Sequence, residues 1–390
     1  MRRSALFVAL GFVAIGFAGL TLHYGRAVPE KPDVELESSP ETVVASSFKA
    51  SRELEPIPEA PPGRMTPEML ELITHGLPIE GCDKFSGTQL DFGREEEQKE
   101  EIRKAVQLLS VSGDPEYLIG AALLDFERGD DGSHPLLEQA LQQLPEHPVA
   151  LWHKMQHCRG TGCERSASAR ALTQADPTNG LMWIKVAAEH IRDGNPGEAE
   201  AALRRAIAAP RFDNYFIDYV TVIERALAAT TEMDYAQRVV YGIGISAAAA
   251  IPMYGDIFNA CKSETNDAAV WSPLCDELGQ SMADRSRDLM STMIGHGLRK
   301  VAATRVGDAD RAAVMQRERD HMQERYIDTQ TRVGAHAVLL NDHAVLQRYI
   351  DTFRAHGEMR AIDNLVDEAI RLRADETYDQ CNFVIRQLDD

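Results

Sequence analysis

Proline recurs at a nearly constant interval in the middle of the chain. Pro115, Pro148, Pro177 and Pro210 are separated by 33, 29 and 33 residues. Proline is excluded from helix interiors, and an interval of this size has room for two helices joined by a turn. Ala and Leu, which favour helix, are abundant. A pair of helices this small cannot bury its apolar face alone, so successive pairs have to stack. The sequence therefore predicts stacked helices in this region.

The third interval, DPTNGLMWIKVAAEHIRDGNPGEAEAALRRAIAAP, shows the pattern most clearly. We expect one helix, a turn at DGNPG and a second helix. The residues expected on the packed faces are Trp183, Val186, Ala187 and His190 in the first helix and Ala199, Leu203 and Ala206 in the second. The preceding intervals repeat this register with Trp152, Leu172 and Ala175, and more loosely with Leu137, Leu141 and Leu144.

These residues resemble the tetratricopeptide repeat, whose unit is about 34 residues long. The positions that carry the resemblance are Trp183, Ala187, Ala199, Leu203, Ala206 and Pro210. His190 stands where that family usually has an aromatic residue, and Leu203 stands where it has Phe. The resemblance covers roughly residues 114–211, and we place the repeat region at 67–211. It implies a right-handed stack of helical hairpins that binds proteins.

The N-terminus carries a long uncharged segment. Arg2 and Arg3 precede residues 4–22, nineteen residues without a charge. As a helix, this segment would be about 28 Å long, close to the roughly 30 Å of a bilayer core. We expect a single-pass anchor in the inner membrane, with its positive end cytoplasmic and residues 27–390 in the periplasm. The alternative is a cleaved signal peptide, which would release the protein into the periplasm.

The remainder of the chain is expected to be helical, with no strand. Residues 27–67 hold eight prolines and few large apolar residues, which predicts a disordered linker over 27–66. Helices are expected to start at Pro67, to cover 91–113 and to continue through 212–390. The uncharged segment 239–254 is too short and proline-interrupted for a good membrane span, and we favour a buried helix there. The last residues, 382–390, are expected to form a short amphipathic helix docked on an all-α domain.

Six cysteines, an even number, suit disulfide bonds in an oxidising compartment. Cys158 and Cys163 flank RGTG at a turn between two helices of the middle repeat, where a short bridge is geometrically feasible. An alternative pairs His153 with His157, one helical turn apart, as zinc ligands. A zinc protease motif would need Glu where Lys154 stands, so we expect no metal here.

Two more disulfides are predicted. Cys261 and Cys275 lie at the ends of two helices joined by a polar turn. Cys82 and Cys381 remain and would pair by elimination, although six cysteines permit fifteen connectivities.

The sequence predicts binding rather than catalysis. The formal net charge of −20 argues against nucleic acid as a partner. We find no phosphate-binding loop, no dinucleotide motif and no nucleophile motif, and we predict no catalytic, cofactor-binding or metal-binding residue. The expected function is a membrane-tethered scaffold for unidentified proteins. One alternative is an enzyme whose pocket gathers His296, His321, His336 or His343 with acids. Another is a self-associating structural protein of the envelope.

Overall fold

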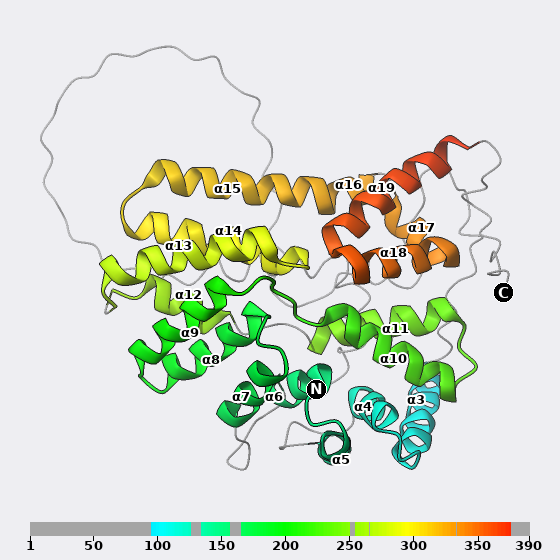
Figure 1. Cartoon of the computed structure of the whole chain (residues 1–390). Helices are drawn as coiled ribbons and strands as arrows, with labels where there is room; N and C mark the ends of the chain where they lie inside the picture. Colours follow the sequence, from blue (N-terminus) through cyan, green and yellow to red (C-terminus); the bar gives the residue numbers. More distant parts are fainter. Residues whose placement is uncertain are drawn as a thin grey trace, which may run out of the picture.

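The computed structural model describes residues 95–125, 134–156, 165–249, 254–264, 266–332 and 334–375. Within these ranges the secondary structure is helical and contains no strand, which confirms the all-α prediction (Figure 1). The predicted anchor 4–22, the linker 27–66 and the closing segment 382–390 lie outside them. No helix in the described ranges has the length and apolarity to cross a bilayer.

The bounds of the helices in the first half of the fold are α3 (Glu95–Ser110), α4 (Pro115–Leu124), α5 (Pro135–Gln143), α6 (Pro148–Gln156), α7 (Arg165–Ala175), α8 (Gly180–Arg192), α9 (Pro196–Ala208), α10 (Phe216–Thr230) and α11 (Tyr235–Ala249). Those of the second half are α12 (Gly255–Lys262), α13 (Ala268–Arg285), α14 (Leu289–Arg305), α15 (Ala309–Gln323), the π-helix η1 (Glu324–Asp328), α16 (Thr329–Arg332), α17 (Ala335–Asn341), α18 (His343–His356) and α19 (Glu358–Ala374).

The proline intervals correspond to helical hairpins. Helices α4 and α5, α6 and α7, and α8 and α9 pack pairwise. Pro115 and Pro148 are the first residues of α4 and α6, a position where the missing proline N–H costs nothing. Asp114 caps α4, its carboxylate accepting a hydrogen bond from the Glu116 N–H at 2.9 Å. Local sequence chemistry therefore set where these helices begin.

The predicted packed faces are partly correct. Ala199, Leu203 and Ala206 of α9 are fully buried, as expected. In α8, however, the most buried side of the helix includes Leu181 and Ile184. The other residues expected there are Ala187, which is buried, and Trp183, Val186 and His190, which are half-buried. The repeat register therefore misplaced the buried face of α8, because this helix packs against α12 as well as against its hairpin neighbours.

Helix α10 occupies the inner side of the hairpin stack. It packs against α3 and α4, where a Cβ placed on Gly120 would lie only 2.6 Å from the Cβ of Ala226. It also contacts α6, where the ring centroids of His153 and Tyr219 are 5.9 Å apart. The buried residues of α4, α6, α8 and α10 form one continuous core. The chain itself therefore covers part of the stack beside α3 and α4, and it reaches α6 through the ring contact of Tyr219.

The uncharged segment 239–254 contributes to α11, a buried helix of fifteen residues. Gly242 allows the close approach to α10 that its small size predicts, since an added Cβ would lie 3.1 Å from the Val220 carbonyl oxygen. Ser246 is fully buried and donates a hydrogen bond to the Gly242 carbonyl at 2.7 Å. The described part of this segment therefore behaves as a packed core helix.

The C-terminal helices pack around two further cores. Helices α17, α18 and α19 bury their apolar residues against α10 and α11. Tyr326 in η1 and Ile362 in α19 join Leu289 and Met293 of α14 in a smaller cluster. Figure 1 shows α15 running along α14 and meeting α19 through η1 and α16. The connections between these layers pass through one polar region.

Candidate functional site

Extended connectors meet where the hairpin stack joins the C-terminal helices. The Gly180 N–H donates to the Arg211 carbonyl at 2.8 Å, and the Arg287 N–H donates to the Phe212 carbonyl at 2.9 Å. The Glu358 N–H in turn donates to the Arg287 carbonyl at 2.7 Å. We call residues 176–180, 211–215, 285–289 and 357–358 the junction. It brings together four segments that lie far apart in the sequence.

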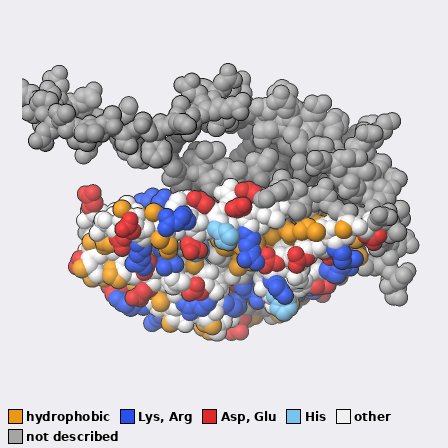
Figure 2. Space-filling model, turned by 90° about the horizontal axis from the view of Figure 1, so that it is seen from above, with side chains coloured by type: hydrophobic (Ala, Val, Ile, Leu, Met, Phe, Trp, Pro, Cys, Tyr) orange, Lys and Arg blue, Asp and Glu red, His pale blue; other side chains and the backbone are white. Residues whose placement is uncertain are grey.

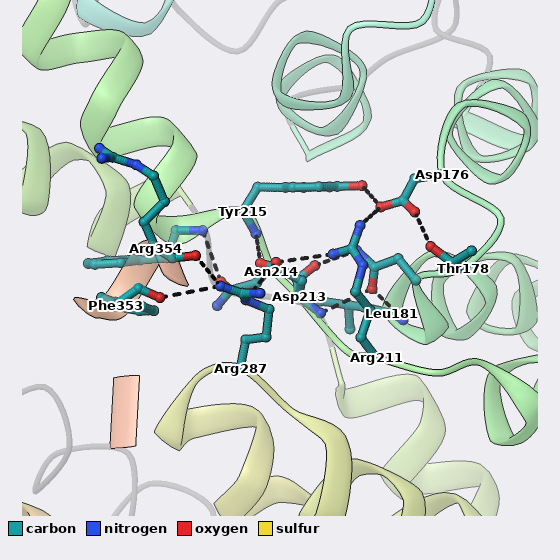
Figure 3. A network of polar contacts seen from close by, with 12 residues as sticks. Asp176, Thr178, Leu181, Arg211, Asp213, Asn214, Tyr215, Arg287, Phe353 and Arg354 are labelled. Carbon is teal, nitrogen blue, oxygen red and sulfur yellow. Dashed lines mark hydrogen bonds and ion pairs between the residues drawn. The ribbon is translucent and has the colours of Figure 1, made fainter. Parts of the chain in front are cut away.

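Asp176 is one centre of the junction (Figure 3). Its carboxylate accepts hydrogen bonds from the Arg211 guanidinium and from the Tyr215 hydroxyl, both at 2.6 Å. It also accepts one from the Thr178 hydroxyl at 2.9 Å. The Tyr215 ring stands edge-on to Trp152, with centroids 6.1 Å apart. The third hairpin is thereby tied to the connector that leads into α10.

Asp213 is the second centre of the junction. Its carboxylate forms ion pairs with Arg211 at 3.1 Å and with Arg287 at 3.3 Å. Arg287 also donates to the carbonyl of Phe353 at 3.3 Å and to that of Arg354, at the end of α18. Helix C-termini carry unpaired carbonyl oxygens and partial negative charge, which a guanidinium neutralises. Arg287 therefore links the connector to α18.

The connector carries an unusual backbone conformation at Tyr215. Its φ of 58° lies in the left-handed region, which large side chains rarely adopt. The Asp213 carboxylate accepts a hydrogen bond from the Tyr215 N–H at 2.9 Å, and the Asn214 side chain accepts one from the Phe216 N–H at 3.0 Å. These contacts hold the turn that starts α10.

Buried carboxyl groups surround these ion pairs. Burial, together with the negative charge of Asp213, raises the pKa of Asp218 to about 6. Burial also raises the pKa of Asp288 to about 6. The pKa of Glu358 rises to about 7, mainly through burial, although its carboxylate accepts the Leu289 N–H at 2.7 Å. The junction can therefore take up protons between about pH 6 and 7.

The predicted disulfide between Cys261 and Cys275 is confirmed, with an S–S distance of 2.01 Å. It joins α12 to α13, and the Arg305 guanidinium donates to the Cys261 carbonyl at 3.1 Å. The sequence did not predict this contact of Arg305, because the arginine lies 44 residues from its acceptor. The remaining cysteines, Cys82, Cys158, Cys163 and Cys381, lie outside the described residues, as does His157.

The histidines considered for chemistry are dispersed over several helices. His296 is buried on α14 and His336 is half-buried on α17, and burial lowers the pKa of both. His321 is exposed on α15, and His343 begins α18. In the described ranges no three His, Cys, Asp or Glu side chains are placed to hold a metal ion.

Sequence reasoning also missed the junction arginines. Arg285 donates to the carbonyls of Ile207 and Ala209 at the end of α9, at 2.7 and 2.6 Å. The sequence DRSRD at 284–288, where α13 ends and α14 is about to begin, is the local signal, since Arg and Asp at a helix boundary suit capping. It does not reveal which helix ends the arginines reach.

Two large aliphatic side chains are exposed near the end of α3. Leu108 and Val111 near the end of α3 are 57% and 82% exposed. Lys104, one turn before Leu108, is exposed on the same side of the helix and lies 3.9 Å from Glu100. We call Lys104, Leu108 and Val111 the α3 outer face.

No protein-family model, curated protein or solved structure matches this chain.

Proposed function

We propose that the protein is a membrane-tethered periplasmic scaffold that binds another protein through the α3 outer face. The observation that carries this proposal is the exposure of Leu108 in α3, the first described helix, and of Val111 in the turn directly after it. Terminal helices of stacked repeats normally present a polar outer side. Two large aliphatic side chains in water on that side are a feature of interaction surfaces.

Because of the packing of α10, we place the binding site on a different surface from the one that the tetratricopeptide resemblance implies. That family would offer the inner side of its stack to a partner, but here α10 packs on α4, and its Tyr219 contacts His153 of α6. Helix α10 does not cover the α3 outer face. Its mixture of apolar residues and a lysine suits a helical partner segment with an apolar stripe and an acidic edge.

A photo-crosslinking amino acid placed at Leu108 or Val111 of the full chain, in its native envelope, tests this proposal. We expect both positions to capture the same protein. Val306, which is 60% exposed at the end of α14, is the matched control position and should not capture it. The purified partner should bind the wild-type domain and lose at least tenfold in affinity to a Val111→Glu variant.

Three results would contradict the proposal. Equal capture from Val306 would mean that the contacts are non-specific. A crosslinked product formed by two copies of this chain would instead favour the self-associating envelope protein, which mass measurement in detergent would verify. Loss of binding in Val306→Glu as well would show that charge alone, rather than this surface, was responsible.

A further inference from the structure

Helix α19 carries two apolar stripes. The first, formed by Ala361, Leu365, Ala369 and Leu372, is buried against α17, α18 and their neighbours. The second, which we call the outer stripe, consists of Ile362, Val366 and Ile370, spaced four residues apart. A surface helix needs only one apolar stripe to join a core. The outer stripe therefore calls for a second packing partner.

Only the first part of the outer stripe is covered. Ile362 is 3% exposed and packs with Tyr326 of η1, beside the ion pair of Arg325 and Asp363 at 3.0 Å. Val366 is half-buried, and Ile370 in the last full turn of α19 is 50% exposed. The exposure thus increases toward the end of the helix. Figure 2 shows a row of hydrophobic side chains on the face of the molecule seen from above.

The chain itself supplies a segment of suitable size directly after this stripe. Helix α19 ends at Ala374, and the sequence continues to Asp390, closing with NFVIRQLDD at 382–390. The seven residues between Ala374 and Asn382 lie within the usual range of 2–8 for a connection between packed helices. Nine helical residues span about 14 Å, and the eight steps from Ile362 to Ile370 span about 12 Å.

Charge favours one orientation of this segment. An antiparallel return would place Phe383 near the exposed Ile370 and bring Asp389 and Asp390 toward the covered end of the stripe. Arg325 borders that end, stacked over Tyr326 with 51% of its side chain exposed. A second guanidinium–carboxylate contact there would add to the existing pair with Asp363.

We propose that residues 382–390 form a helix that docks antiparallel on the outer stripe of α19 and completes the C-terminal layer. This intramolecular surface is independent of the α3 outer face. A partner protein or a second copy of the chain would need the same apolar residues, so the experiment must distinguish these occupants from the chain's own end.

A photo-crosslinking amino acid at Ile370 of the full chain identifies the occupant. We expect a link within one chain to the peptide that contains residues 382–390. The control position is Val314 on α15, which is 37% exposed and should not link to that peptide. A link from Ile370 to a second copy, a link to a different protein, or no link to 382–390 would overturn the proposal.

A double-mutant cycle gives an independent test. Ile370→Ser and Phe383→Ser should each lower the Tm by about 2–4 °C, since each removes one side of the same contact. The double variant should melt no lower than the worse single variant by more than about 1 °C. Additive shifts would show that the two residues do not interact and would overturn the proposal. Unchanged far-UV circular dichroism confirms that the variants remain folded.

Discussion

Asn179 and Asp213, 34 residues apart, exchange two hydrogen bonds in the buried centre of the junction. The Asn179 amide donates to the Asp213 carbonyl at 2.8 Å, and the Asp213 N–H donates to the Asn179 amide oxygen at 3.0 Å. That oxygen also accepts the Leu181 N–H at 3.2 Å and so caps α8. One side chain therefore both starts a helix and fixes the connector that leads into α10.

Replacing Asn179 with Ala should destabilise the protein strongly. The change removes the cap and leaves buried polar groups of Asp213 without partners, which together cost about 3 kcal/mol or more. Asn195→Ala is the control, because Asn195 occupies the same position before α9, is exposed and makes no side-chain capping bond. Chemical denaturation should show a change of less than about 0.5 kcal/mol for the control. Equal losses in both variants would mean that the paired hydrogen bonds add nothing.

Two buried tyrosines four residues apart, Tyr215 and Tyr219, should differ in how loss of the hydroxyl changes the free energy of unfolding. Tyr215→Phe removes a 2.6 Å hydrogen bond to the Asp176 carboxylate and should cost about 2 kcal/mol. The hydroxyl of Tyr219 is buried without a partner among the described residues. Tyr219→Phe should therefore leave stability unchanged or raise it slightly. Urea unfolding of both variants, with similar slopes, measures the difference, and a larger loss for Tyr219→Phe would refute this reasoning.

The junction should make stability depend on pH. Asp288 is 4% exposed, and burial raises its pKa from 3.8 to about 6, opposed by hydrogen bonds from Ser291 and supported by the charge of Asp213. The folded state therefore binds this proton more tightly than the unfolded state. The contribution of Asp288 to the free energy of unfolding is therefore greatest below about pH 4. It decreases by on the order of 3 kcal/mol as the pH rises through about 6. Glu358 acts in the same direction up to about pH 7.

Asp288→Asn isolates this effect. Asparagine keeps the acceptor for the Ser291 N–H, now 2.7 Å from the Asp288 carboxylate, but cannot ionise. We expect Tm to decline less between pH 4 and 7 in this variant than in the wild type. Asp267→Asn is the control, since Asp267 caps α13 at an exposed position and should leave the pH profile unchanged. A wild-type Tm that rises steadily across this range would contradict the prediction.

The disulfide between Cys261 and Cys275 should contribute measurably to stability. It closes a loop with a sequence separation of 14, for which the chain-entropy model gives about 3 kcal/mol. The double substitution of both cysteines by Ala should lower the free energy of unfolding by about that amount. Mass spectrometry of non-reduced peptides should find the pair bonded in native material. Finding both thiols free would remove one support for the expected oxidising compartment.

Local sequence determined where most of the helices lie. Pro115 and Pro148 start α4 and α6, and Gly113, which follows α3, has a φ of 71°. The buried residues of α9 and the bonded cysteine pair also followed from spacing alone. Each of these features depends on backbone geometry or side-chain size within a few turns of helix. Such short-range constraints can be predicted from a single amino-acid sequence.

Tertiary structure alone decided the inner packing and the polar junction. Nothing near Gly120 indicates that α10 would fill the side of the stack beside it, because the contact with Ala226 spans 106 residues. Arg285 reaches carbonyls 76 and 78 residues away, and no periodicity records that pairing. The sequence by itself determined helices and their turns; the three-dimensional fold decided which helix ends meet. The physical reason is that burial and charge pairing act between groups brought close only by folding.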